Sequence, residues 1–281
     1  MNNSMIHWRD SGKGLRAENQ EFSHLLDLLK DAPGVAIAFS GGADSAFLLA
    51  AARIAGVESV LPVTVVSDFF TAGEKERVIR LGQYLGIAPV FVPADILDDA
   101  RVTRNTDKRC YFCKLFLFSK VMAVAKKYGV HTFLHGANLD DLKEVRPGMD
   151  AARELGFKAP LVAAGFSKEK IRASSKILGL ETWDLPAQSC LATRIPQGDI
   201  ITREKLIKIE RAEICLHDLG FGRVRVRCHG DLARIEAEAD DLHRFVAPDA
   251  RREIIHAFRC AGFSSVCLDL CGYAPTSGML P

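Results

Sequence analysis

Three cysteines carry the chemistry for which this sequence is best equipped. Cys110 and Cys113 form a C-x-x-C within Arg109-Cys110-Tyr111-Phe112-Cys113-Lys114, and Cys190 lies far along the chain. Flanking cations and a following helix favour the thiolate, which is the form of sulfur that acts as a nucleophile or a metal ligand. Three thiolates are too few for a closed zinc site unless a histidine joins, but they suit a centre with one open position, such as a [4Fe-4S] cluster. A zinc site or a redox pair, and for Cys190 a buried small side chain, are the alternatives.

A second group of residues is suited to binding an anion. Ser40-Gly41-Gly42-Ala43-Asp44-Ser45 follows the apolar run 34–39 and precedes a strongly helix-forming segment. Glycines allow main-chain N–H groups to approach a ligand, and the helix dipole favours a negative charge there. The spacing lacks the lysine of a P-loop and the last glycine of a dinucleotide fingerprint. The alternative is a glycine-rich turn with an Asp or Ser helix cap.

Polar residues also follow a later apolar run. Gly136, Asn138, Asp140 and Asp141 come directly after residues 128–135. Carboxylates at the end of a buried strand are suited to contact a metal or a substrate, and a solvated loop is the alternative.

These groups require a fold that brings strand ends together. Apolar runs at 34–39, 57–67, 88–94 and 128–135 alternate with helical patterns, which predicts an α/β fold with a doubly wound, mostly parallel sheet. Such sheets bind ligands at their carboxyl edge. After Pro196-Gln197-Gly198 the pattern changes to a helix, two strands, a helix and a strand. We therefore expect a domain at 1–200 and a smaller α+β domain at 201–281. The predicted helices are 21–29, 73–85, 114–127, one beginning near Ser167, 202–219 and 248–261, and the predicted strands of the smaller domain are 223–229, 232–237 and 266–270.

An arginine row stands out in the smaller domain. Arg223, Arg225 and Arg227 alternate with valines, so a strand would place all three guanidinium groups on one face. Such a row is suited to bind phosphate, because arginine can bond phosphate oxygens bidentately. The wet side of a half-buried strand is the alternative.

Composition limits the classes of protein to consider. The 281 residues are 48% hydrophobic and 26% charged, and the formal net charge of +2 gives no broad cationic surface for nucleic acid. No signal peptide or membrane-spanning run is visible, so we expect a cytoplasmic protein without a membrane partner. Eight cysteines in a reducing compartment indicate thiols or ligands rather than disulfides. Five of them fall on apolar patterns and are predicted to pack in the core: Cys215, Cys228, Cys260, Cys267 and Cys271.

Together the motifs resemble a known family. The loop at 40–45 resembles the S-G-G-x-D-S loop of the ATP pyrophosphatase (PP-loop) superfamily, and Gly136-x-Asn138-x-x-Asp141 resembles its second element. R-C-Y-x-C-K, an R-P-G turn, W-D-x-P-x-x-S-C-L-A-[ST]-R and V-R-V-R-x-H-x-D-x-A-R-I-E are similar to the sulfur transferases of the nickel-pincer cofactor pathway. Val145 stands where that branch usually has tyrosine.

This resemblance implies an activity and a set of site residues. Family members use ATP to adenylate pyridinium-3,5-biscarboxylic acid mononucleotide, release AMP and leave a thiocarboxylate, for the cofactor of lactate racemase. A homo-oligomer, specifically a hexamer, is also implied. The implied nucleotide contacts are Ser40, Gly41, Gly42, Asp44, Ser45, Gly136 and Asn138, with Mg²⁺ at Asp44 and Asp141. The implied catalytic residues are Asp44, Cys110, Cys113 and Cys190, and the implied substrate contacts are Arg146, Arg194, Arg225 and Arg227.

Two sulfur chemistries are known in the family. In one, the cysteine equivalent to Cys190 gives up its own sulfur; in the other, three cysteines hold a [4Fe-4S] cluster. Members of the first kind lack the C-x-x-C, so its presence here favours a cluster on Cys110, Cys113 and Cys190. Amide formation of the NAD-synthetase or GMP-synthetase kind, tRNA thiolation and a non-enzymatic nucleotide-binding module remain as alternatives.

Overall fold

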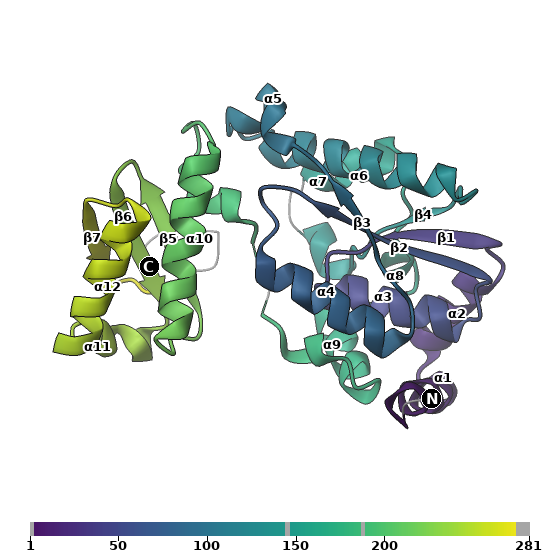
Figure 1. Ribbon diagram of the computed structural model, residues 1–281. Helices are drawn as coiled ribbons and strands as arrows, with labels where there is room; N and C mark the ends of the chain where they lie inside the picture. Colours follow the sequence, from purple (N-terminus) through teal and green to yellow (C-terminus); the bar gives the residue numbers. More distant parts are fainter. Residues whose placement is uncertain (1–2, 144–146, 187–188, 274–281) are drawn as a thin grey trace. The chain divides into compact units, whose positions relative to one another are not determined.

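The chain folds into two compact units (Figure 1). The computed structural model describes residues 3–143, 147–186 and 189–273. The first unit comprises Met1–Ile96 and Lys108–Gln188, and the second comprises Leu97–Asp107 and Ser189–Pro281. The chain therefore passes between the units three times. The expected domains at 1–200 and 201–281 stay a prediction about which segments fold independently.

The first unit is built on a parallel sheet with the strand order β3-β2-β1-β4. This confirms the predicted α/β class. The expected strand at 128–135 is shorter than predicted, because only two of its residues pair with β1. All four strands end at one edge of the sheet, where ligands are expected. The strands are β1 Gly34–Ala38, β2 Ser59–Val66, β3 Val90–Pro93 and β4 Phe133–Leu134.

Helices cover both faces of this sheet (Figure 1). Alternate residues of β1 enter different cores: Val35 and Ile37 join the core beneath α2, α3 and α9, while Ala36 joins the core beneath α6. The helix α1 was not predicted, because its sequence is polar and only Trp8 and Leu15 are buried among its described side chains. The helices of this unit are α1 Asn3–Glu18, α2 Gln20–Lys30, α3 Ala43–Ile54, α4 Ala72–Leu85, α6 Arg109–Lys127, α7 Pro147–Glu154, α8 Pro160–Ala163 and α9 Lys168–Ile177, with 3₁₀ turns η2 Leu139–Lys143 and η3 Glu181–Asp184.

The second unit contains a small mixed sheet with the order β5-β6-β7. Strands β5 and β6 are antiparallel, whereas β6 and β7 are parallel. Helix α10 packs against β5 and α12. This confirms the predicted α+β character of the smaller part. The elements are η1 Ile96–Asp98, which begins in the first unit, α5 Ala100–Thr103, η4 Leu191–Arg194, α10 Arg203–Asp218, β5 Val224–His229, β6 Leu232–Ala237, η5 Ala239–Asp241, α11 Leu242–Phe245, α12 Pro248–Ala261 and β7 Ser265–Leu268.

Most of the cysteines predicted to pack in the core do not. Cys228 is buried and Cys215 is partly buried, but Cys260, Cys267 and Cys271 are exposed. The period of α12 buries Phe258 and Ala261 instead of Cys260. The apolar face of α12 was therefore misassigned by one position, and Cys271 lies in a turn after β7, so the prediction was wrong for these three residues.

A bilayer-spanning helix is not found among the described segments, since none combines the required length with the required apolar content.

Candidate functional site

The loop after β1 turns at a glycine that no other residue could replace without strain. Gly41 has a φ of 74°, in the left-handed region, and a Cβ there would lie 2.8 Å from Val78 Cγ2. The Thr64 hydroxyl donates a hydrogen bond of 2.6 Å to the Phe39 carbonyl, which fixes the strand end before the loop. The predicted glycine bend is therefore present, and its position is fixed from both sides.

Hydrogen bonds between nearby residues hold the loop together internally. The Gly42 N–H donates to Ser40 Oγ at 3.3 Å, the Ser45 hydroxyl donates to the Gly42 carbonyl at 3.1 Å, and the two hydroxyl oxygens are 3.2 Å apart. Gly42 is the N-cap of α3 and has no side chain with which to cap it. The Asp or Ser cap considered from the sequence is therefore not at that position. Helix α3 begins directly after Gly41 and Gly42, so the positive end of its dipole lies at the loop. This arrangement is suited to bind a phosphate.

The second motif reaches this loop through direct backbone contact. A Cβ on Gly136 would lie 2.9 Å from Ser45 N and 3.1 Å from the Asp44 carbonyl carbon. The Asn138 amide donates to Asp44 Oδ2 at 3.2 Å, and the Asn138 N–H donates to Asp141 Oδ2 at 3.0 Å. The structure thus brings together Asp44, Asn138 and Asp141, as the sequence predicted.

Helix α9 contributes a lysine that the sequence analysis missed. Lys168 donates its N–H to Asp140 Oδ2 at 2.7 Å, and its ammonium lies 3.6 Å from Asp141 Oδ1. The side chain of Lys143 also donates to Asp140, and these bonds hold the pKa of that carboxyl below its usual range. Only the Ser167 cap was visible in the sequence, because the contact with Asp140 spans residues far apart in the chain.

Helix α4 holds the glycine loop from the other side. Arg77 Nε donates to the Gly41 carbonyl at 2.9 Å. Burial lowers the pKa of Arg77, although a guanidinium remains charged at physiological pH. The helix begins with a full capping box between Thr71 and Glu74, which fixes its first turn. Arg77 was not among the predicted site residues.

The C-x-x-C lies within a helix rather than before one. Helix α6 begins at Arg109, not at Lys114, because the residues between them contain no helix breaker. Cys110 is exposed and Cys113 is partly exposed. Their spacing of three places both sulfurs on one helix face, as two neighbouring ligands require.

The start of α7 lies against the first turn of α6. A Cβ on Gly148 would lie 2.8 Å from Lys114 Cγ and 3.7 Å from the Cys110 carbonyl. The predicted substrate contact Arg146 lies outside the described residues, together with Glu144 and Val145.

His135, at the end of β4, is held neutral by its surroundings. Its ring lies 5.8 Å from that of Phe118 and 6.4 Å from that of Phe157, measured between centroids. Burial, with the nearby Lys114 charge, lowers the pKa of His135 to about 4, although Asp141 acts in the opposite direction.

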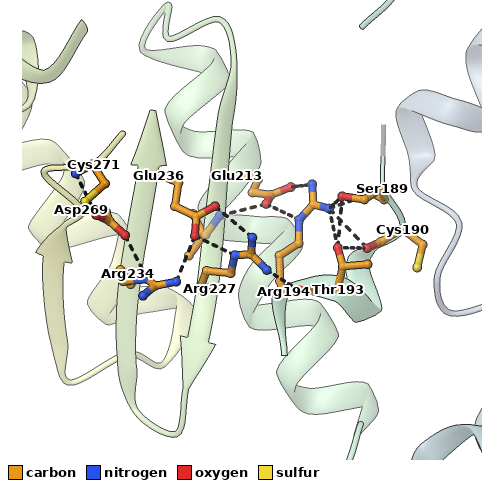
Figure 2. Close-up of polar contacts among 11 residues, drawn as sticks. Ser189, Cys190, Thr193, Arg194, Glu213, Arg227, Arg234, Glu236, Asp269 and Cys271 are labelled. Carbon is orange, nitrogen blue, oxygen red and sulfur yellow. Dashed lines mark hydrogen bonds and ion pairs between the residues drawn. The ribbon is translucent and has the colours of Figure 1, made fainter. Parts of the chain in front are cut away.

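In the second unit, Cys190 stands at the start of a turn that one arginine holds (Figure 2). Cys190 is exposed, whereas Arg194 is only 8% exposed. Arg194 Nη1 donates to the Ser189 carbonyl and hydroxyl at 2.7 Å each, and it lies 3.2 Å from the Cys190 carbonyl and 3.1 Å from Thr193 Oγ1.

A carboxylate from α10 holds that arginine. Glu213 accepts from Arg194 Nε at 2.9 Å and from Nη2 at 3.3 Å. The same carboxylate accepts the Val226 N–H of β5 at 2.9 Å. Glu213 thus joins the turn to both α10 and β5, and no sequence motif indicated it.

A second set of ion pairs reaches the turn from the sheet (Figure 2). Arg227 Nη1 donates to the Thr193 carbonyl at 2.7 Å, and its other nitrogens donate to Glu236 at 2.8 and 3.1 Å. Arg234 donates to Glu236 at 3.0 Å and lies 3.5 Å from Asp269. Glu236 therefore orients Arg227, which is one of the predicted substrate contacts.

The arginine row is less exposed than expected. Arg225 is only 5% exposed, and burial lowers its pKa. The guanidinium groups of Arg225 and Arg223 lie 4.1 and 4.4 Å from the centre of the Tyr273 ring. The three guanidinium groups are therefore not all open to solvent, because β6 supplies Glu236 and the segment after β7 supplies Tyr273.

Comparison with known proteins identifies the family. No family model matches the chain. It is 33% identical to pyridinium-3,5-bisthiocarboxylic acid mononucleotide synthase of Lactiplantibacillus plantarum, over 89% of this chain and 90% of that protein. The chain belongs to this synthase family. It is also 39% identical, over 84% of its length and 88% of the relative, to an uncharacterised protein of Synechocystis sp..

A more distant match agrees with the fold. The chain is 27% identical to the glutamine-hydrolysing GMP synthase of Aeropyrum pernix, over 70% of this chain and 42% of that protein. Together with the four-stranded parallel sheet, this match supports a PP-loop architecture for a member of the synthase family.

The predicted residues of this family member fall into two groups. The first unit contains the nucleotide loop, Gly136, Asn138, Asp141, Cys110 and Cys113, whereas the second contains Cys190, Arg194, Arg225 and Arg227. The convergence of the three cysteines therefore stays a prediction. Across the described ranges, no cluster of three or more His, Cys, Asp or Glu side chains could hold a metal ion.

Proposed function

We propose that the protein is an ATP-dependent sulfur transferase that converts pyridinium-3,5-biscarboxylic acid mononucleotide to its thiocarboxylate. The 33% identity to a pyridinium-3,5-bisthiocarboxylic acid mononucleotide synthase over almost the whole chain carries this proposal. The glycine loop at 40–45 and the exposed Cys190 support it, because they supply a phosphate site and a nucleophile. The product would serve the nickel-pincer cofactor of lactate racemase.

The first step would be adenylation of a substrate carboxylate. A carboxylate is a poor electrophile, and transfer of AMP from ATP creates an acyl adenylate with a good leaving group while pyrophosphate departs. Main-chain N–H groups of the Gly41–Gly42 bend would bind the phosphates, as the glycine geometry supports. Ser40 and Ser45 would add hydroxyl groups.

Mg²⁺ fits the residues that surround this loop. Asp44 and Asp141 are both hydrogen-bonded to Asn138, so hard oxygen donors gather beside the helix start. Magnesium is often bound by one or two carboxylates together with substrate phosphates. Asp44 and Asp141 would hold the ion, which would neutralise phosphate charge.

The second step would be attack by sulfur on the acyl adenylate, with a new carbon–sulfur bond and the departure of AMP. Cys110 and Cys113 lie one turn apart on α6 and offer two of the three sulfurs that a [4Fe-4S] cluster needs, and Cys190 would be the third. Such a cluster would supply a sulfide to the activated acid. In the alternative route the Cys190 thiolate attacks and AMP leaves. The Cys190 Cβ–Sγ bond then breaks with loss of the Cα proton, which leaves dehydroalanine in the chain and the sulfur on the product.

The negatively charged phosphate and carboxylates of the substrate require positively charged side chains to bind them. We propose that Arg225 and Arg227, with Arg146, lie near the phosphate and carboxylates of the mononucleotide. The Arg227 side chain supports this, since 21% of it is exposed and Glu236 fixes its guanidinium plane. A homo-oligomer remains part of the proposal through the family resemblance, and a cytoplasmic location remains part of it as an expectation from the sequence.

Two measurements test the function. Incubation with ATP, Mg²⁺ and the mononucleotide should release AMP and pyrophosphate and yield a product in which oxygen is replaced by sulfur, as mass spectrometry would detect. No release of AMP would reject catalysis, and an amide product formed from ammonia would favour the GMP-synthetase-like alternative.

The source of sulfur needs a separate experiment. Iron and sulfide analysis of protein purified without oxygen should find a cluster if the three cysteines bind one. A colourless, iron-free protein that thiolates once per chain would reject the cluster and support the loss of sulfur from Cys190.

A further inference from the structure

Arg194 directs its hydrogen-bond donors into its own turn. The guanidinium has five N–H donors in a fixed plane. Two nitrogens meet the Glu213 carboxylate, and the third meets the Ser189 carbonyl and hydroxyl, the Cys190 carbonyl and Thr193 Oγ1 (Figure 2). An anionic substrate would have to displace Glu213 to bind this guanidinium bidentately.

The Arg194–Glu213 pair is also enclosed. The Arg194 and Glu213 side chains are 10% and 12% exposed. Breaking an enclosed pair leaves a charge without its partner, which is strongly unfavourable. Exchange of Glu213 for a substrate during each catalytic cycle is therefore disfavoured, although the sequence alone indicated a substrate contact for Arg194.

The contacts that Arg194 makes with the turn are to main-chain oxygens on both sides of the Cys190 α-carbon. Its bonds to the Ser189 and Cys190 carbonyls restrain the backbone on either side of the Cys190 Cα–Cβ bond. Glu213 in turn accepts the Val226 N–H, so the position of the turn is set by the first residues of the sheet and by α10. Arg227 adds a bond to the Thr193 carbonyl.

We propose that Arg194 and Glu213 are positioning residues that fix the direction of the Cys190 thiol and do not contact the substrate. This inference rests on the proposed function for the role of Cys190, whereas the restraint on the turn does not depend on it. A misplacement of about 1 Å in a reacting group can cost about 10²-fold in rate. The pair therefore acts on the rate of sulfur transfer and leaves substrate affinity unchanged.

The test uses a double variant that preserves folding. Arg194→Gln alone would leave Glu213 enclosed and unpaired, whereas Arg194→Gln combined with Glu213→Gln removes both charges and keeps an acceptor for the Val226 N–H. Arg244→Gln is the matched control, because Arg244 pairs with Asp241 in the same unit and does not contact the turn. Circular dichroism and the melting temperature verify that both proteins fold.

The kinetic readout separates positioning from substrate contact. We expect kcat for thiolation by the double variant to fall by about 10²-fold, with KM for the mononucleotide within twofold of wild type. The control should retain both values. A KM that rises tenfold or more with kcat unchanged would overturn the proposal and return Arg194 to the substrate site.

A second readout does not depend on catalysis. Amide hydrogen exchange in residues 189–195 should be at least ten times faster in the double variant than in wild type, and unchanged in Arg244→Gln. Unchanged exchange in the double variant would overturn the proposal whatever the activity. Suppose that exchange is faster in the double variant and that the wild-type protein makes no thiolated product. These results would support the restraint of the Cys190 turn by Arg194 and Glu213 and would reject the proposed function, so failure of one proposal can be told from failure of the other.

Discussion

The glycine loop of the first unit and the Cys190 turn of the second differ in what holds them. The loop at 40–45 is held internally by hydrogen bonds between residues at most five apart in the chain, and Arg77 and Asn138 contact it from other segments. The Cys190 turn takes its shape from Glu213, Arg227 and Glu236, which come from α10, β5 and β6. A short sequence motif specifies the first arrangement, whereas the second depends on charge pairs between distant segments.

The largest predicted effect concerns the cysteine itself. Cys190→Ser should lower the rate of thiolation by at least ~10³-fold, because the hydroxyl is neither a sulfur donor nor a cluster ligand of comparable quality. ATP–pyrophosphate exchange should continue, since the glycine loop belongs to the other unit.

Cys260→Ser is the matched control for this variant, because Cys260 is also exposed in the second unit. It should retain the wild-type rate in the same mass-spectrometric assay. Thiolation by Cys190→Ser at the wild-type rate would show that Cys190 takes no part in the reaction. The glycine loop would then be the only one of the two compared regions with a catalytic role.

A methyl group added at Gly136 should greatly weaken ATP binding at the glycine loop. Gly136→Ala places a Cβ 2.9 Å from Ser45 N, where only backbone can yield. We expect the Kd for ATP to rise about 100-fold, which corresponds to about 2.7 kcal/mol. Isothermal titration calorimetry measures this change.

Gly73→Ala serves as the control for the added methyl group, because a Cβ on Gly73 meets nothing within 4 Å. Its Kd should equal that of wild type. If Gly136→Ala binds ATP as tightly as wild type, the close approach of the segment after β4 to the loop does not shape the nucleotide site.

Acid should weaken the first unit through His135. Its pKa is about 4 in the folded state against 6.5 as the ordinary value, so the unfolded chain takes up the proton first as pH falls. The stability contribution is complete above pH 6.5 and is lost as pH falls toward 4, which amounts to about 2 kcal/mol between pH 7 and pH 5. His135→Gln should lose this dependence.

Tryptophan fluorescence during urea unfolding follows the first unit alone, since both tryptophans, Trp8 and Trp183, belong to it. His24→Gln, at an exposed position of α2, is the matched control and should follow wild type. If the free energy of unfolding falls equally in His135→Gln and in wild type on acidification, titratable groups other than His135 cause the loss.

The smallest predicted effect tests whether the loop depends on the helix beside it. Thr71→Ala removes the cap of α4 and should cost about 1 kcal/mol, which lowers the Tm of the first unit by about 2–4 °C. Thr71→Ser retains a hydroxyl and should retain the wild-type Tm.

The Kd for ATP should stay within twofold of wild type in Thr71→Ala, because the hydrogen bonds within the loop do not involve Thr71. A larger change would show that Arg77 of α4, which donates to the Gly41 carbonyl, transmits the loss of the cap to the loop.

The sequence predicted the parts of the site that depend on local pattern. The apolar runs predicted the parallel sheet, and the glycine loop, Gly136 and Asn138 were predicted to meet at its carboxyl edge, where Asn138 contacts Asp44. Lys168, Arg77 and Glu213 were missed, because each acts through a contact between residues at least nineteen apart in the chain.

Errors of prediction also had physical causes. The start of α6 was placed after the C-x-x-C, since the basic residues around the cysteines obscured the helical pattern. The burial of Arg225 was not predicted, because a single strand does not show which side chains, such as Tyr273, pack against it. Glu236 on β6 faces Arg225 in the register of the sheet and pairs with Arg227.

The segment 97–107 has a consequence for synthesis on the ribosome. Buried Asn105 donates to the Pro196 carbonyl at 2.7 Å and accepts from the Gly198 N–H, so an early stretch of the chain completes a unit made mainly of late residues. During translation residues 97–107 leave the ribosome first, and residues 108–188 of the first unit follow. Only then is the segment that begins at residue 189, with which residues 97–107 pack, synthesised. A fragment that begins at residue 189 lacks residues 97–107 of its unit. Addition of a peptide with the sequence of residues 97–107 should therefore help the fragment to fold.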